Sequence, residues 1–319
     1  MKGKLLDWLR VGRIHTAPAT VILLVSSYVA GGGSLFSLMG LLLFLYGLLN
    51  HWTCFGHNVV MDYWWDLEDK SKQHHPLTAG RIRLEDAVNV VNGLLGVCLL
   101  IGLLFAWGNW WSLFWFALFI AGGFLYNNWL SKTTVWGWVP ITVCYTSLSI
   151  YAMGLAGGFN LLYALYIMFT IWFQIGWSGY LKEIEVSKQA NLLRRLGAGV
   201  EDGWFRASII AKLFGAGVKL GNFCLGLVML YYVDFWRQVI GAFLLVAMWA
   251  MLDLCVLRDR KWDRLKELKN MSLMEIVTIY LGMFLVMPLA EALVLAAFGL
   301  AWFTLMNKYL WRTKLIPRV

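Results

Sequence analysis

The segment from Asn58 to Asp66 carries the side chains best suited to chemistry in this sequence. Asn58, Asp62 and Asp66 are spaced four residues apart, so on a helix they lie on one face. Two carboxylates and an amide offer oxygen ligands, and Mg²⁺ in proteins is commonly held by one or two carboxylates together with substrate phosphates. The spacing therefore predicts a magnesium site that holds a diphosphate through the metal.

The same segment has a simpler interpretation, a solvated acidic helix end balanced by Lys70 and Lys72. Its surroundings argue against that interpretation. The apolar stretch that ends near Asp62 is long enough to cross a bilayer. Acidic side chains near membrane depth are costly and are usually functional.

Membrane-spanning helices must position this segment. The chain has 319 residues, of which 60% are hydrophobic and 14% are charged, whereas soluble domains carry about 25% charged residues. Each span must be helical, because lipid offers the backbone no hydrogen-bond partner. We predict an all-α membrane protein, a polytopic bundle of nine or ten transmembrane helices. Stretches of spanning length lie at 14–32, 35–61, 86–107, 110–129, 134–156, 160–181, 205–232 and 235–256, and a longer one covers 271–308.

The last apolar region decides between nine and ten spans. A single helix over 271–308 would be about 57 Å long, nearly twice the ~30 Å hydrocarbon core. Pro288 lacks a backbone donor and clashes with the preceding turn, so it is a natural break. We expect two passes here, with one long helix kinked at Pro288 as the alternative.

The basic residues predict the orientation. Of the 27 Lys and Arg residues, 21 fall in the N-terminal segment and at every second loop, whereas the opposite loops contain only Arg237. Cytoplasmic loops carry an excess of Lys and Arg, so we expect the N-terminus and the acidic segment to be cytoplasmic. The net charge of +9 is scattered over short loops beside spans. We therefore expect contact with anionic lipid and no nucleic-acid partner.

The loop after Asp66 continues with Pro76, Leu77, Gly80 and Arg81. Together with the acidic residues, this segment resembles the UbiA superfamily of intramembrane prenyltransferases. The first motif of that family reads roughly NDxxDxxxD and is followed closely by a segment like NRPLxSGR.

Two positions depart from the first family motif. Val59 stands where an Asp is usual, and His75 stands where an Arg is usual. The loss of that Arg leaves one fewer permanent cation near the phosphate. A neutral His75 could still donate a hydrogen bond there.

Two later segments also resemble the family. Tyr126 and Lys132 resemble its Tyr…Lys segment, in which the Lys is thought to contact the diphosphate; their simpler interpretation is an interfacial Tyr and a snorkelling Lys. Lys182 and Glu183 resemble the start of its second acidic motif, typically KDxxxD. Ser187 stands where the second Asp of that motif is expected.

The neutral Ser187 weakens the predicted second metal site unless Glu185 or Asn191 compensates. On one continuous helix, Glu183, Ser187 and Asn191 would share a face. Asp62 and Glu183 lie 121 residues apart. We therefore treat 1–319 as a single membrane domain with pseudo-repeat halves at about 14–133 and 134–256, followed by C-terminal helices at 271–308.

The resemblance implies a bundle around a central cavity open to the cytoplasmic side and the bilayer. It implies Mg²⁺-dependent transfer of a prenyl group from a polyprenyl diphosphate to an aromatic, isoprenoid or lipid acceptor, with release of diphosphate. It assigns the metal to Asn58, Asp62, Asp66 and Glu183, and catalysis to Asp62, Asp66, Lys132 and Glu183. It assigns substrate binding to Asn58, Arg81, Tyr126, Lys182 and Arg194.

Two alternatives remain open at this point. The weakened second motif allows a terpene cyclase, in which the prenyl chain attacks itself. A non-enzymatic lipid-binding or transport protein would show broken helices and polar residues at the membrane midplane, and Glu291 beside Pro288 mildly favours it. The sequence names neither the acceptor nor the length of the prenyl chain.

Overall fold

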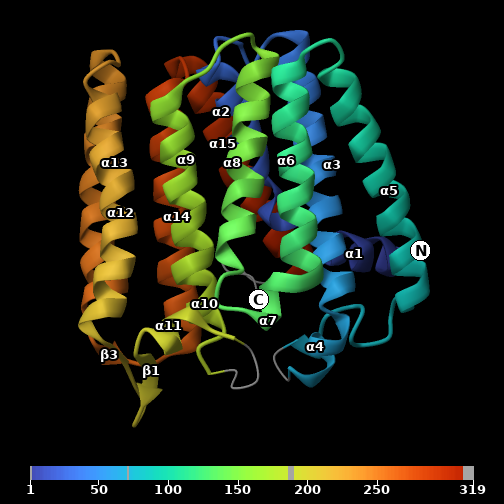
Figure 1. The fold of residues 1–319 in the computed structure, drawn as a ribbon, viewed down its shortest axis with the longest axis vertical. Helices are drawn as coiled ribbons and strands as arrows, with labels where there is room; N and C mark the ends of the chain where they lie inside the picture. The colour runs from blue at the N-terminus through green and yellow to red at the C-terminus, as the bar shows by residue number, and fades with distance from the viewer. Residues whose placement is uncertain (1, 70–71, 186–189, 312–319) are drawn as a thin grey trace.

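The computed structural model describes residues 2–69, 72–185 and 190–311, apart from the side chains of Lys2, Lys132 and Trp311. The long helices run side by side as a bundle (Figure 1). They are α3 (Leu38–Met61), α5 (Leu84–Phe105), α6 (Trp110–Leu125), α8 (Trp138–Leu155), α9 (Leu161–Phe173), α12 (Ile209–Leu230), α13 (Phe235–Leu252), α14 (Arg264–Val286) and α15 (Leu289–Trp311).

Three of these helices continue into π-helical segments at their C-terminal ends. Helix α6 runs into η3 (Tyr126–Leu130) and α7 (Ser131–Thr133), α9 into η4 (Gln174–Gly179) and α10 (Tyr180–Lys182), and α13 into η5 (Asp253–Leu257). With these extensions, nine helices in the described part of the chain are long and apolar enough to cross a membrane. The predicted class, a polytopic helical membrane protein, is confirmed.

Local sequence sets where the helices begin. Six long helices start at a side chain that accepts a hydrogen bond from the backbone N–H three residues later, which is the usual N-cap arrangement. The six capping residues are Ser37, Asn109, Asn160, Ser208, Asp234 and Asp263.

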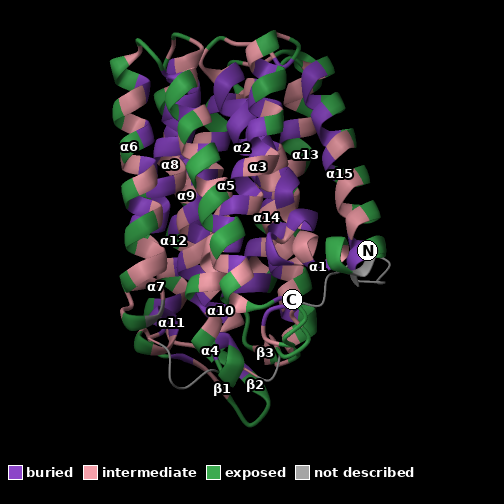
Figure 2. Ribbon diagram, turned by 90° about the vertical axis from the view of Figure 1, so that its right-hand side faces the viewer, coloured by how far each residue is buried: buried purple, intermediate pink, exposed green. Residues whose placement is uncertain are grey.

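The first predicted span is the helix at the centre of the bundle. The chain begins with α1 (Lys2–Val11), then η1 (Ile14–Thr16) and α2 (Ala17–Ala30). Helix α2 contacts α3, α8, α9, α14 and α15, and almost all of it is buried (Figure 2). The apolar helix Ile14–Ala30 is shorter than the other nine, and it is shorter than the ~20 residues of an ordinary span.

The region 271–308 contains two antiparallel helices. Met287 is extended and separates α14 from α15. Near the start of α15, Glu291 accepts hydrogen bonds from the Ser34 hydroxyl and the Leu35 N–H in the loop after α2. At its other end, the Leu310 carbonyl accepts from Arg10 of α1. The two-pass prediction is confirmed as far as the fold is concerned.

The structure contains a small antiparallel sheet that the sequence analysis did not predict. Strands β1 (Ala198–Glu201) and β2 (Trp204–Ala207) form a hairpin, and β3 (Arg260–Lys261) pairs with β2. The turn residues Asp202 and Gly203 have φ of 50° and 75°, which fits the type I′ turn that Asp-Gly favours. The sheet ties the 182–212 segment to the loop before α14.

The ends of the bundle differ in charge, as the sequence predicts. The N-terminal segment and the basic loops lie at the end that carries the hairpin and α4 (Tyr63–Glu68), whereas Arg237 lies at the start of α13 at the other end.

One basic residue, Lys219, lies inside a helix and was not considered when the basic residues of the loops were counted. It is buried within α12. Its Nζ donates to Thr278 Oγ1 at 2.7 Å and lies 4.4 Å from the centroid of the Phe173 ring.

Candidate active site

The first acidic motif lies where α3 passes into α4. Helix α3 ends at Met61, and Asp62 stands at the junction with φ −83° and ψ 0°. The backbone still follows the helical pattern, because the Asp62 N–H donates to the Asn58 carbonyl and the Asp66 N–H donates to the Asp62 carbonyl, each at 2.9 Å. The structure therefore brings Asn58, Asp62 and Asp66 together on successive turns.

The two carboxylates are buried. Asp62 and Asp66 are each 5% exposed, so the interpretation as a solvated helix end is wrong. Asn58 Nδ2 donates to Asp62 Oδ2 at 2.9 Å, and Lys72 Nζ forms an ion pair with Asp66 Oδ1 at 2.7 Å. Buried carboxylates need this kind of compensation, because an unpaired charge out of water is costly.

The donor set fits a hard divalent cation. Asn58, Asp62 and Asp66 supply oxygen atoms, and Mg²⁺ prefers oxygen ligands. Among the described residues, no three His, Cys, Asp or Glu side chains are grouped closely enough to hold an ion. Asp62 and Asp66 therefore supply two carboxylates, and metal sites of this kind are commonly completed by water and substrate phosphates.

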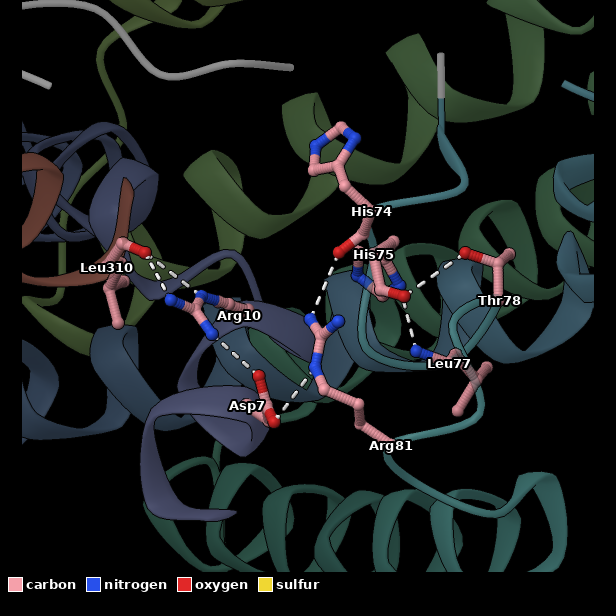
Figure 3. A network of polar contacts seen from close by, with 8 residues as sticks. All are labelled: Asp7, Arg10, His74, His75, Leu77, Thr78, Arg81 and Leu310. Atoms are coloured by element: carbon pink, nitrogen blue, oxygen red, sulfur yellow. Dashed lines mark hydrogen bonds and ion pairs between the residues drawn. The ribbon is translucent and has the colours of Figure 1, made fainter. Parts of the chain in front are cut away.

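The loop that follows is tied to both ends of the chain (Figure 3). Arg81 Nε pairs with Asp7 Oδ2 at 3.1 Å, and its Nη2 donates to the His74 carbonyl at 3.0 Å. Asp7 Oδ1 also pairs with Arg10 Nη1 at 2.6 Å. Arg10 then donates to the Leu310 carbonyl at 2.6 and 3.0 Å. The guanidinium that the resemblance assigned to the diphosphate thus holds the loop against α1.

The Tyr…Lys segment meets the first motif from the end of α6. Tyr126 is half-buried and begins the π-helical turn η3. Asn127 Nδ2 lies 2.9 Å from His57 Nδ1 on α3, one residue before Asn58. Sequence reasoning missed this contact between two predicted motifs. The side chain of Lys132 lies outside the part of the chain that is described.

The second motif departs from the predicted helix. Helix α10 ends at Lys182, Glu183 caps it, and the next helix, α11 (Leu192–Arg195), begins after Asn191. The prediction that Glu183 and Asn191 share one helix face is therefore wrong. Asn191 caps α11 with its Oδ1 and donates Nδ2 to the Tyr180 carbonyl at 2.7 Å, so it serves the backbone. Ser187 lies outside the described residues.

The remaining predicted cations lie around this second segment. The side chain of Lys182 is half-buried, and its carbonyl accepts from Arg264 Nη2 at 3.4 Å. Arg194 is half-buried within α11. A cavity of about 460 Å³ lies elsewhere, at the far end of the bundle, where Asn160, Tyr232 and Arg237 help to line it. The predicted central cavity remains a prediction.

Comparison with known proteins identifies the family of this chain. The model of the UbiA prenyltransferase family matches residues 19–267. The chain belongs to the UbiA prenyltransferase family.

Solved structures share the fold at low sequence identity. A structure of digeranylgeranylglyceryl phosphate synthase is 17% identical with a TM-score of 0.63, covering 89% of this chain and 98% of the other. A UbiA homolog from Archaeoglobus fulgidus bound to GPP and Mg²⁺ is 13% identical with a TM-score of 0.63, over 88% and 99%. An apo UbiA homolog from Aeropyrum pernix K1 is 13% identical with a TM-score of 0.58, over 90% and 97%. No curated protein sequence matches the chain.

Proposed function

We propose that this protein transfers a prenyl group from a polyprenyl diphosphate to an aromatic, isoprenoid or lipid acceptor within the membrane, and that the reaction requires Mg²⁺. The observation that carries the proposal is the buried pair Asp62 and Asp66, set on successive turns at the end of a membrane helix. A homolog of the same fold that binds GPP and Mg²⁺ supports it.

Asp62 and Asp66 would hold the metal, and Asn58 would orient Asp62 through the hydrogen bond it already makes. When bound, Mg²⁺ would neutralise the negative charge that develops on the diphosphate as it leaves. Glu183 assists the metal in this proposal. Tyr126, Lys132, Lys182 and Arg194 bind the diphosphate from the ends of the other helices.

The reaction breaks the bond between C1 of the prenyl chain and the diphosphate oxygen. The allylic carbon then bonds to the acceptor, the acceptor loses a proton, and diphosphate leaves. The role of the chain is to place the two reactants together and to keep water from the carbocation. A site at the end of an apolar bundle suits both tasks.

We further propose that the active-site end of the bundle faces the cytoplasm. The basic loops gather at that end, and Arg237 marks the other.

A terpene cyclase remains the second candidate. Ser187, in place of the second carboxylate of the family motif, keeps this alternative open. A transport protein loses its main support, since Glu291 accepts two hydrogen bonds from the loop at Ser34 and Leu35 and so has a structural role.

The test is to incubate purified protein with labelled geranylgeranyl diphosphate and Mg²⁺, with and without a panel of aromatic and lipid acceptors. Prenyl transfer predicts a labelled adduct that appears only with an acceptor. A labelled hydrocarbon formed without any acceptor would establish the cyclase. Absence of turnover under all conditions, from a protein that still binds the diphosphate, would contradict both enzymatic proposals.

A further inference from the structure

Arg13 has an unusual backbone conformation. It lies between α1 and η1 with φ 45° and ψ 41°, in the left-handed region. A residue with a Cβ is strained there, and such strain persists when the surrounding structure requires it, often at functional sites. In the described part of the chain, only Asp202 shares a positive φ among non-glycine residues. Asp202 belongs to a hairpin turn. Arg13 follows the C-terminal end of α1, where its N–H donates to the Arg10 carbonyl and a left-handed residue commonly ends a helix.

The guanidinium of Arg13 lacks an anionic partner. The side chain is half-buried, and its Cζ lies 5.6 Å from the centroid of the Phe55 ring. Among the described residues it forms no ion pair and no side-chain hydrogen bond. Arg10 and Arg81, by contrast, are both satisfied by Asp7 and by backbone carbonyls. A partly buried cation without a counter-charge is costly, which points to an anion supplied from outside the chain.

Phe55 places this cation beside the acidic pair. It precedes Asp62 by seven residues, which is about two helical turns, so both lie on the same face of α3. Two turns correspond to about 10 Å along the helix axis. A diphosphate held through a metal on Asp62 and Asp66 would reach back toward the guanidinium across that gap.

His75 stands next to Arg13. Burial and, secondarily, the positive charge of Arg13 lower the pKa of His75 to about 3, so the ring is neutral at physiological pH. Its Nδ1 accepts from the Leu77 N–H at 3.4 Å, which leaves the proton on Nε2. Nε2 is buried without a hydrogen-bond partner in the described chain. The Arg10 carbonyl lies beside the ring but outside hydrogen-bonding geometry.

We infer that Arg13 and His75 together form an anion-binding pair that contacts the phosphate groups of the prenyl diphosphate. Arg13 supplies the permanent cation that the loop lacks at position 75, and His75 donates a neutral N–H. Arg81 is then a positioning residue of the loop. This inference rests on the proposed function, since it needs a diphosphate at Asp62 and Asp66.

The experiment measures the dissociation constant of inorganic diphosphate with Mg²⁺ for the full-length protein in detergent, by calorimetry. Arg13→Gln removes the charge and leaves a shorter, neutral polar side chain. We expect it to weaken binding at least about tenfold, as the loss of a charge-assisted hydrogen bond does. Adding His75→Arg to this variant should restore affinity to within about threefold, because the cation returns to the same site.

The matched control is Arg83→Gln, since Arg83 is exposed and forms an ion pair with Asp86. The affinity of this variant should equal that of the wild type. His75→Arg alone should tighten binding, and this variant keeps the test decisive if Arg13→Gln does not fold. Unchanged affinity in Arg13→Gln, or no recovery in the double variant, would overturn the inference. Asp62→Ala separates the two proposals: if it also binds normally, the metal–diphosphate site itself is wrong.

Discussion

At the scale of single residues, the acidic pair is stabilised by neighbours that a bound metal would partly replace. Lys72 neutralises Asp66, and Asn58 hydrogen-bonds to Asp62. Spacing alone placed the two carboxylates on one face. It could not show that Lys72 reaches back across six residues, because that contact depends on how the loop folds.

This arrangement predicts a metal-dependent rescue. Lys72→Met leaves Asp66 buried without its counter-charge, and breaking a fully buried pair costs about 3–5 kcal/mol. The cost here should be smaller, because the Lys72 side chain is 23% exposed. The melting temperature without metal should fall, and added Mg²⁺ should raise it more in Lys72→Met than in the wild type. An equal response to Mg²⁺ in both proteins would count against a metal at Asp66.

Asp7 and Arg81 provide a second residue-scale prediction. If Arg81 positions the loop, Asp7→Asn and Arg81→Gln should raise the KM for prenyl diphosphate by similar factors. The double variant should then be no worse than either single one, because both changes remove the same contact. If Arg81 binds the diphosphate, Arg81→Gln should be far worse than Asp7→Asn, and the two effects should multiply. Steady-state kinetics on the four proteins decides between these outcomes.

At the scale of elements, the sequence predicted the spans and the break at Pro288 well. Hydrophobic length and a proline act locally, so both can be read directly from the chain. The hairpin was missed although its signal was present, since the dipeptide Asp202-Gly203 is a strong hairpin-turn signal. The end of α10 at Lys182 was missed because the i, i+4 spacing of Glu183, Ser187 and Asn191 fits a helix. Spacing alone does not show whether the backbone stays helical.

The π-helical segments could not be predicted. In the described chain, η3, η4 and η5 end α6, α9 and α13 at the same end of the bundle as the acidic motif. Such segments often mark functional sites, because they change the direction in which side chains point. They depend on tertiary packing, and η3 places Asn127 against His57.

The contact of α15 with the loop after α2 gives a prediction at this scale. Glu291 is 7% exposed and accepts two hydrogen bonds from that loop. Hydrogen bonds to charged groups contribute about 1.5–3 kcal/mol each. Glu291→Ala should therefore lower the melting temperature clearly, and Glu291→Gln should lower it less because it keeps an acceptor. Turnover at low temperature should match the wild type in both. A loss of turnover in folded Glu291→Gln would reopen a functional role.

At the scale of the whole molecule, the two ends of the bundle have different tasks. Both acidic segments, the basic loops, α1 and the end of α15 lie at one end. The network through Asp7 joins the first and last helices to the loop after the acidic pair. Sequence patterns predicted that the acidic segments and the basic loops lie on the same side of the membrane. They could not predict the contact between Arg10 and Leu310, because these residues are 300 positions apart in the sequence.

Cysteine labelling tests the orientation. In a variant whose five native cysteines are replaced, single cysteines are placed at Asp202, Tyr309 and Tyr231, all exposed positions. Asp202 and Tyr309 lie at the active-site end, and Tyr231 lies at the other. An impermeant thiol reagent added to intact cells should label only the Tyr231 position. Labelling at Asp202 would reverse the proposed orientation, and opposite results at Asp202 and Tyr309 would contradict the two antiparallel C-terminal helices.

The central claim is that Asp62 and Asp66 hold the metal that activates a prenyl diphosphate. The most direct test measures diphosphate release from labelled prenyl diphosphate by wild type, Asp62→Asn and Asp66→Asn, each folded in detergent. Asn keeps the shape but removes the charge that holds a cation. We predict that wild-type activity disappears in excess EDTA and returns with Mg²⁺, and that Asp62→Asn loses at least about 10³-fold in turnover, a transition-state effect of about 4 kcal/mol. Wild-type turnover by Asp62→Asn, or full activity in EDTA, would contradict the claim.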